Sequence, residues 1–267
     1  MTPWRQGDSM VIGWSQSEPA GRDRSPVAAS AWAQVEAAQR QARVPCLLVP
    51  QPAHAVLAGE LADGLTCFGE LPPEIKRAIQ MHDTGWASSD AQQIQRLRSG
   101  GVHAARMVPV SFLAIPPAEA EEAWTASINT VETFSKPGAI VVSRHFTLLA
   151  QNDPAHHQRF LQAERARQRK FQGSEEDLDR WTAALGFCDL VSLCLLCGLN
   201  GPVEFPVAHP SSPQAKNAPR VSMQVVGKDL RFTPEIVRIG CTLSIQALKH
   251  PVPTQGPRAE TLTWEVQ

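Results

Sequence analysis

Hydrophobic residues recur every three to four positions over much of the chain, a spacing that predicts amphipathic helices. From Pro52 onward, Leu57, Leu61 and Leu65 share one stripe of such a helix. The same spacing predicts further helices at residues 71–83, 118–134 and 174–199, and one that begins at Pro137. Residues 28–43, rich in alanine and other strong helix formers, and the charged stretch 154–172 are also predicted to be helical. Between Trp86 and Pro117 the pattern weakens, and the sequence indicates a polar segment that ends in a turn.

Strand-like patterns are concentrated at the C-terminal end. After Gly201 the residues Pro, Ser and Asn are frequent, and short strands with turn signals between them follow at residues 220–227, 230–248 and 260–266. One earlier stretch, "VPCLLVP" at residues 44–50, predicts a short strand. We therefore predict a mainly α protein, a helical bundle with a small C-terminal antiparallel β appendage. Its expected parts are residues 1–44, an extension with one helix, residues 45–200, the helical domain, and residues 201–267, the β-rich segment.

Composition and charge narrow the range of functions. An apolar fraction of 43% over 267 residues is ample for a core, and the net charge of −1 has no basic cluster that would indicate a nucleic-acid polymer or a membrane surface as partner. The N-terminus lacks the features of a signal peptide. The most apolar run, residues 184–199, is too short for a membrane span and contains an aspartate. We expect a soluble, cytoplasmic protein.

Six cysteines occur, mostly in apolar surroundings. Cys194 and Cys197 form a CxxC pattern, but a zinc or redox site would need a second pair of ligands or a preceding thioredoxin-like strand. Neither is present, so we interpret the cysteines as small buried side chains of the core.

Several polar groups fall on the apolar faces of the predicted helices. His54, His82 and His145 each share a stripe with apolar residues, and Asp189 is the only charge between residues 184 and 199. A buried ionised carboxylate is costly unless it is paired, hydrogen-bonded or bound to a metal. Imidazole nitrogen and carboxylate oxygen together suit divalent ions.

The His82–Asp83 pair raises a geometric question, because adjacent helical residues point about 100° apart. Both can reach one ion only beside the end of the helix, where Thr84 and Gly85 terminate it. Taken singly, each inward histidine has a plainer interpretation as a hydrogen-bonded core residue, and the whole set could form a hydrogen-bonded core network. The remaining histidines lie in polar or loop contexts and are expected at the surface: His103, His156, His157, His209 and His250.

The order His54, His82–Asp83, Asp189 resembles the H…HD…D signature of the HD-domain superfamily of metal-dependent phosphohydrolases. The stretches "PAHAVLAGELA", "MHDTGW" with Asp90 downstream, "SRHFTLL" and "CDLVSL" resemble, within it, a bacterial family of uncharacterised HD-like proteins. The resemblance covers roughly residues 46–199. It departs from binuclear members, which carry further histidines between the HD pair and the last aspartate, since here only His145 is well placed.

The resemblance implies an HD-like helical domain in which His54, His82, Asp83 and Asp189 hold a divalent ion, with Mn, Fe, Zn, Mg and Ni not distinguished. It implies hydrolysis of a small phosphorylated or nucleotide-like substrate by a water whose pKa the metal lowers. Asp83 and His145 are the expected catalytic residues, His145 as an acid or base or as a ligand to a second ion.

Other points stay open at this stage. Arg144 is either a phosphate contact or a surface residue, and Trp86 either lines the pocket or packs the helix end. Alternative functions are an HD-fold di-iron oxygenase and a non-catalytic metal-binding or sensing domain, and a homo-oligomer is left open.

Overall fold

The computed structural model describes residues 10–13, 30–41, 47–99, 111–250 and 258–267. Its elements occur in the order β1 (Met10–Gly13), α1 (Ala31–Gln41), β2 (Leu47–Pro50), α2 (Gln51–Gly64), α3 (Pro73–Gln80), η1 (Thr84–Trp86), α4 (Ala87–Ser99), η3 (Phe112–Ala114), α5 (Pro117–Glu132), α6 (Lys136–Ala150), α7 (Gln158–Arg169), α8 (Glu175–Leu196), β3 (Val203–Pro206), η4 (Pro213–Lys216), β4 (Arg220–Val226), β5 (Asp229–Thr233), β6 (Thr242–Lys249) and β7 (Ala259–Val266).

The strands form one mixed sheet in the order β1-β2-β6-β7-β5-β4-β3. Neighbouring strands are antiparallel except β5 and β7, which run parallel. In β4 and β6 buried and exposed residues alternate, the pattern of a sheet with one face on the core. The central pair β6 and β7 has the longest register, from Thr242 opposite Glu265 to Leu248 opposite Ala259.

The predicted mainly α fold with a small β appendage is wrong. Strands β1 and β2 come from the first fifty residues, and β2 joins the C-terminal strands because Leu48 pairs with Leu248 of β6. Sheet and helices also share one hydrophobic core, which contains Leu57 and Leu185 from the helices together with Leu243 and Trp264 from the sheet. The molecule is therefore a mixed α/β structure, and the expected HD-like helical bundle is not what the chain forms.

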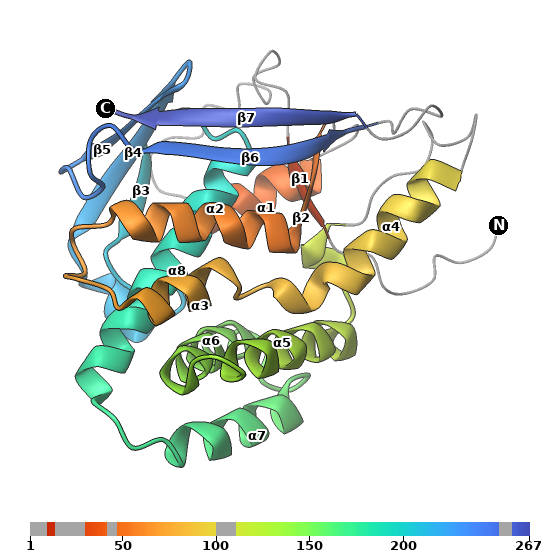
Figure 1. Cartoon of the computed structure of the whole chain (residues 1–267), viewed down its shortest axis with the longest axis vertical. Coiled ribbons are helices and arrows are strands. Elements are labelled where there is room, and N and C mark those ends of the chain that lie inside the picture. The colour runs from red at the N-terminus through yellow and green to blue at the C-terminus, as the bar shows by residue number, and fades with distance from the viewer. Residues whose placement is uncertain (1–9, 14–29, 42–46, 100–110, 251–257) are drawn as a thin grey trace.

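Helix α2 lies between strand β6 and helix α3. Figure 1 shows β6 and β7 side by side along one edge of the molecule, α2 directly beneath them, and α5, α6 and α7 on the opposite side. The helix follows β2 without a loop, and the backbone N–H of Gln51 donates to Asp90 Oδ2 at 2.7 Å. Asp90 thereby satisfies a backbone donor that the first turn of α2 leaves free.

Helix α4 occupies part of the segment for which the sequence indicated only a polar stretch. Its inward residue Leu97 packs with Leu48 of β2 in a small separate cluster, a contact that local periodicity alone did not reveal. Before it, α3 ends at Gln80, so His82 and Asp83 lie in the turn between α3 and η1 rather than in the last helical turn.

Two serines begin the helices that supply the other inward groups. Ser135 accepts a hydrogen bond from the backbone of Gly138 at the start of α6, and Ser174 accepts one from Asp177 at the start of α8. Ser at this position is a preferred N-cap because its oxygen replaces a missing helical acceptor. The acidic first turn of α8 also favours the helix dipole.

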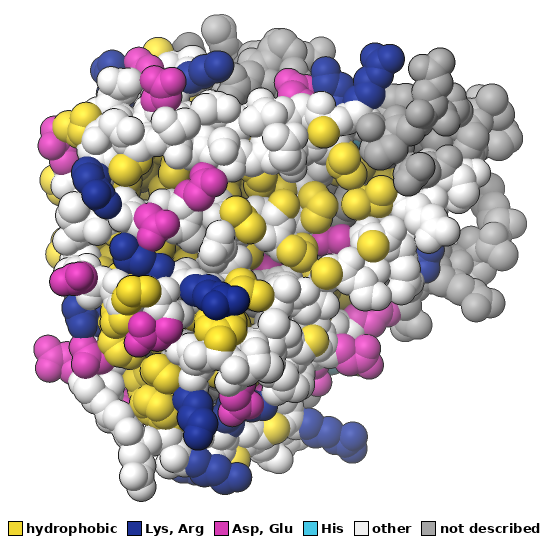
Figure 2. Space-filling model, viewed as in Figure 1, with side chains coloured by type: hydrophobic (Ala, Val, Ile, Leu, Met, Phe, Trp, Pro, Cys, Tyr) yellow, Lys and Arg dark blue, Asp and Glu magenta, His cyan; other side chains and the backbone are white. Residues whose placement is uncertain are grey.

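Neither sign of charge dominates the face of the molecule drawn in Figure 2. On the face drawn in Figure 2, basic and acidic side chains are interspersed over the described residues. Among the helices that the structure describes, none is long and apolar enough to cross a bilayer. Cys188, Cys194 and Cys197 are buried as expected, whereas Cys67 is exposed, and Cys46 lies outside the described residues.

Candidate metal centre

Five side chains from separate parts of the chain meet in the interior. His54 comes from α2, His82 and Asp83 from the turn after α3, His145 from α6 and Asp189 from α8. All are buried, and the carboxylate side chains of Asp83 and Asp189 keep only 9% and 8% of their surface exposed. The structure thus brings together every residue proposed from the sequence as a ligand or catalytic group.

The orientation of His82 is set by the end of α3. Its Nδ1 lies 2.7 Å from the carbonyl oxygen of Ile79, which can only accept, so Nδ1 carries the proton. The opposite ring atom, Nε2, therefore faces the centre, 3.5 Å from both Asp83 Oδ2 and Asp189 Oδ1. At this distance the contacts are at the limit of hydrogen bonding.

The turn after Asp83 is held tightly against α5. A Cβ added to Gly85 would lie 2.0 Å from the carbonyl oxygen of Ala123, so only glycine fits, and the Gly85 N–H donates to Ser127 Oγ at 2.9 Å. The Trp86 indole packs with Ala123 and donates to Asp83 Oδ1 at 3.1 Å. Trp86 thus packs the helix end and also orients a carboxylate of the centre.

His54 lies between the two carboxylates. Its Nδ1 is 3.5 Å from Asp83 Oδ2 and its Nε2 is 3.1 Å from Asp189 Oδ1. Both ring nitrogens of His54 and Nε2 of His82 are buried and have no hydrogen-bond partner among the described residues. Since buried polar atoms are normally hydrogen-bonded, three such atoms facing two carboxylates call for a cation.

The spacing of these atoms fits a metal ion. Two groups, His54–His82–Asp83 and His82–His145–Asp189, each place their ligand atoms within 4.8 Å of one another. Ligands about 2.1 Å from one ion are roughly 3.0 to 3.4 Å apart at octahedral to tetrahedral angles. This is close to the 3.5 Å from Nε2 of His82 to Asp83 Oδ2 and to Asp189 Oδ1, and from Nδ1 of His54 to Asp83 Oδ2. The centre could therefore hold a divalent ion.

Burial and mutual charge strongly shift the protonation equilibria of the centre. Burial alone would raise the pKa of Asp189, but the His82 imidazole 3.5 Å away and the charges of the neighbouring histidines lower it to about 2. Burial lowers the pKa of His82, and the carboxylates of Asp83 and Asp189 outweigh this and raise it to about 9. Burial also raises the pKa of Asp83 to about 6 and lowers that of His54 to about 3. Without a metal, a proton on His82 is the cation that balances the carboxylates.

A further histidine, His209, belongs to this region and was wrongly expected at the surface. It is 2% exposed, and its Nε2 lies 2.9 Å from Nδ1 of His145. The other nitrogen of His145, Nε2, lies 3.8 Å from Asp189 Oδ2. His209 follows β3 in an irregular segment, which has no periodicity from which burial could be inferred.

A glycine in α8 provides the space for His209. A Cβ added to Gly186 would lie 2.4 Å from Cδ2 of the His209 ring. Glycine inside a helix costs about 1 kcal/mol relative to alanine, so its presence between two large apolar residues was the available signal of a close neighbour.

The other histidines expected at the surface differ among themselves. His156 is exposed, as predicted, and lies 2.7 Å from Asp153. His157 is buried, contrary to that prediction, and its Nδ1 lies 2.9 Å from Glu121 Oε1. His250 is half-buried, and His103 lies outside the described residues.

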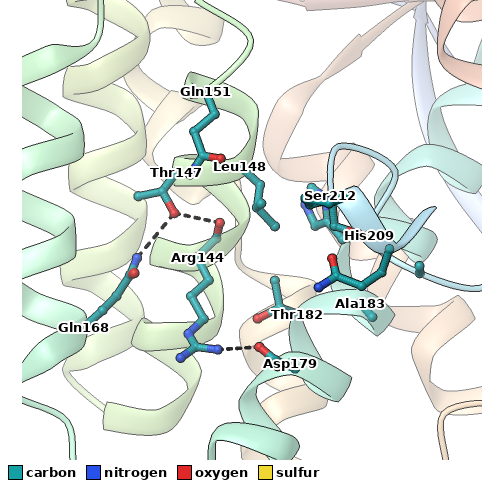
Figure 3. Close-up of a pocket in the computed structure, with 13 residues that line it drawn as sticks. Arg144, Thr147, Leu148, Gln151, Gln168, Asp179, Thr182, Ala183, His209 and Ser212 are labelled. Carbon is teal, nitrogen blue, oxygen red and sulfur yellow. Dashed lines mark hydrogen bonds and ion pairs between the residues drawn. The ribbon is translucent and has the colours of Figure 1, made fainter. Parts of the chain in front are cut away.

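A cavity of about 350 Å³ lies beside the centre, between α6, α8 and the segment after β3 (Figure 3). His209 lines it, so the His145–His209 pair lies between the cavity and the carboxylates. Thr182 also lines it, and its hydroxyl oxygen is buried with no hydrogen-bond partner in the described structure.

Arg144 lines the same cavity. Its NH1 donates to Asp179 Oδ1 at 2.8 Å, as Figure 3 shows, and its NH2 donates to Glu175. Its side chain is 17% exposed, whereas those of its two acidic partners are more than 70% exposed. The guanidinium is therefore held in place at the cavity and partly neutralised.

Fold and centre together define a mixed α/β protein with a buried His/Asp cluster able to hold a metal ion. The chain belongs to DUF3891, a family of proteins of unknown function, whose model matches residues 39–242. No curated protein and no solved structure matches the chain significantly. The resemblance to the HD-domain superfamily is thus wrong as an identification, because the matching family is DUF3891 and the described residues include a seven-stranded mixed sheet that shares one core with the helices.

Proposed function

We propose that the protein is a divalent-metal-dependent hydrolase whose ion is held by His54, His82, Asp83 and Asp189. The observation that carries this proposal is the set of buried imidazole nitrogens on His54 and His82 that face two carboxylates and have no hydrogen-bond partner in the part of the chain that the structure describes. When bound, a divalent ion would act there as a Lewis acid that lowers the pKa of water and polarises an ester oxygen.

The chain's own groups prepare the ligands. The Ile79 carbonyl fixes the ring of His82 with its Nε2 toward the carboxylates, and the Trp86 N–H holds one oxygen of Asp83 while the other faces His54 and His82. Such outer contacts orient ligands and tune their basicity. His54 can offer only one nitrogen as a ligand at a time, and the other is then free to donate to the adjacent carboxylate.

A small phosphoric ester is the substrate class that we propose for the reaction. Arg144 supports it as the only cationic side chain among the described residues that line the cavity, and guanidinium groups bind phosphate oxygens well. Asp179 and Glu175 compete for this guanidinium, so a phosphate would have to displace at least one of them. Asp83 would act as a ligand close to the reacting water, and His145 as a group that handles protons beside it.

A second candidate is a non-catalytic metal-binding protein. The near-complete burial of the ligands favours it, because structural metal sites are closed by protein ligands whereas catalytic sites keep a position open. The two candidates share the metal ion and differ in turnover.

The test begins with the metal content of the purified full-length protein after loading with Mn²⁺, Fe²⁺ or Zn²⁺ and desalting. Mass-spectrometric elemental analysis should find bound metal in the wild type and a loss in His82→Ala and Asp189→Ala. The control is His156→Ala, which removes a solvent-exposed histidine that does not belong to the buried set. A wild type that retains no metal would show that the cluster is a protonated hydrogen-bonded core network.

Loaded protein is then assayed against phosphoric monoesters and diesters. Turnover that falls in Asp83→Ala, with the fold intact by circular dichroism, supports the hydrolase. Bound metal without turnover on the whole panel would instead favour the non-catalytic candidate.

A further inference from the structure

The two rings of the His145–His209 pair share one proton, because their facing nitrogens are 2.9 Å apart and only one of them can donate. Which ring donates decides what the far nitrogen of His145 can do at the metal centre. The backbone around His209 settles the direction.

A contact with Ser211 fixes the proton position on His209. The backbone N–H of Ser211 donates to Nδ1 of His209 at 3.2 Å. A ring nitrogen that accepts a hydrogen bond carries no proton, so the proton of His209 is on Nε2. Nε2 is the atom that faces His145, and His209 is therefore the donor of the pair.

The proton position on His209 in turn fixes that on His145. Its Nδ1 accepts from His209 and carries no proton, so the proton of its ring is on Nε2. We propose that His145 is not a metal ligand but an N–H donor directed at the centre, and that His209 positions the proton of His145. This inference rests on the proposed function. The centre accordingly takes one ion rather than two.

The geometry at the centre agrees with this role. The His145 Nε2 lies 3.8 Å from Asp189 Oδ2, longer than a normal hydrogen bond, so this N–H stays available to an oxygen atom of a molecule at the metal. A metal ligand would need a lone pair at the same nitrogen. The group His82–His145–Asp189 thus loses its second imidazole. The group His54–His82–Asp83 remains, with Asp189 Oδ1 3.5 Å from Nε2 of His82.

The packing of His209 makes the arrangement specific. The ring sits against Gly186 of α8, where a side chain would exclude it, and it is almost fully buried. Among the described residues, the ring contacts of His145 are to His82, Phe146 and His209, and Asp189 is the carboxylate that faces it.

Nitrogen NMR of the full-length protein labelled with ¹⁵N-histidine tests the proton positions directly. In the metal-free wild type, His145 and His209 should each show a protonated Nε2 and an unprotonated Nδ1. After one equivalent of Zn²⁺ is added, the resonances of His54 and His82 should shift as ligands, while Nε2 of His145 keeps its proton. A deprotonated, zinc-bound Nε2 on His145 would overturn the proposal and leave the proposed function standing.

Two variants test the positioning role of His209 without a substrate. His209→Phe keeps the ring but removes the donor, and His209→Gln keeps an N–H. We expect both to bind one equivalent of Zn²⁺ with affinity within about threefold of wild type, a smaller effect than the roughly 10–100-fold that loss of a ligand-orienting contact causes. The fraction of His145 that carries its proton on Nε2 should fall in His209→Phe, where nothing donates to Nδ1, and should stay near that of the wild type in His209→Gln.

The outcomes separate the two proposals. A wild type that binds two equivalents of Zn²⁺, or a His209→Phe variant in which the fraction of His145 protonated on Nε2 equals that of the wild type, overturns the inference. A wild type that binds no Zn²⁺ removes the proposed function, and the metal-free spectrum then still decides the proton positions of the pair. If His209→Phe does not fold, the wild-type spectrum and His209→Gln carry the test.

Discussion

The ring centroids of His82 and His145 lie 5.5 Å apart in the same buried centre, yet the Nδ1 atoms of the two rings make hydrogen bonds of opposite direction. His82 places its Nδ1 against the carbonyl of Ile79, an acceptor, whereas His145 places its Nδ1 against His209, a donor. The inner nitrogen of His82 is thereby available as a ligand and that of His145 carries a proton. The role of each histidine is set by the contact behind it, not by its distance to the carboxylates.

The largest expected effect is the difference in Zn²⁺ affinity between substitutions of His82 and of His145. His82→Ala removes a ligand and should weaken Zn²⁺ binding by more than the roughly 100-fold upper range for an outer contact. His145→Gln should leave affinity within about threefold, because no ligand is lost. Competition titration with a chromophoric chelator measures both, and equal losses in the two variants would break the comparison.

The next prediction concerns the contact behind Asp83. Trp86→Phe removes the indole donor to Asp83 and should lower metal affinity by roughly 10–100-fold, the usual cost of losing an outer contact. Trp181→Phe is the matched control, since the Trp181 N–H has no hydrogen-bond partner in the described structure. The same titration applies, and an unchanged affinity in Trp86→Phe would mean that Asp83 is not a ligand.

A pH prediction follows from the proton on His82 in the metal-free protein. Its pKa rises from 6.5 to about 9 on folding, so the folded state holds the proton more tightly than the unfolded chain. This stabilisation is complete below pH 6.5 and is lost as the pH rises to 9, a change in unfolding free energy of roughly 3 kcal/mol. Urea unfolding with chelator at pH 6.5 and 9.5 measures it.

His82→Asn is the control for the pH prediction, and its unfolding free energy should change less over the same range. Saturating Zn²⁺ should also suppress the loss in the wild type, because the ion takes the place of the proton. A loss of the same size in His82→Asn would show that another group is responsible.

The smallest expected effect concerns the space beside His209. Gly186→Ala places a Cβ about where the His209 ring lies and should cost roughly 1–3 kcal/mol of stability through overpacking. Gly201→Ala, at a site with no heavy atom within 4 Å, is the control. Thermal unfolding compares them, and a neutral Gly186→Ala would show that His209 can move away at little cost.

Sequence periodicity predicted the inward-facing residues of the helices but not the extent of the sheet. The 3.6-residue repeat predicted that His54, His145 and Asp189 point inward, and all three are buried. The same reasoning missed the extent of the sheet, because β1, β2 and β3 are four residues long and their partners are distant in sequence. A four-residue strand has too few positions for a pattern to show which other strand it joins.

The roles of individual histidines could be assigned only from their contacts in the folded structure. The sequence left His145 open between ligand and acid or base, because nothing local shows which residue lies behind Nδ1. His209 was placed at the surface, since irregular segments usually run there. Its burial depends on Gly186, a residue 23 positions earlier in the chain.

The pairing of Leu48 with Leu248 has a consequence for how the protein is made. At a synthesis rate of about 5–20 residues per second, β2 waits on the order of 10–40 s before β6 leaves the ribosome. During that time the face of α2 that β6 will cover, where Glu60 later accepts the backbone N–H of Ser244, has no sheet above it. All the residues proposed to bind the metal precede β6 in the chain, so the nascent protein passes through a stage with its ligands made and its sheet still open.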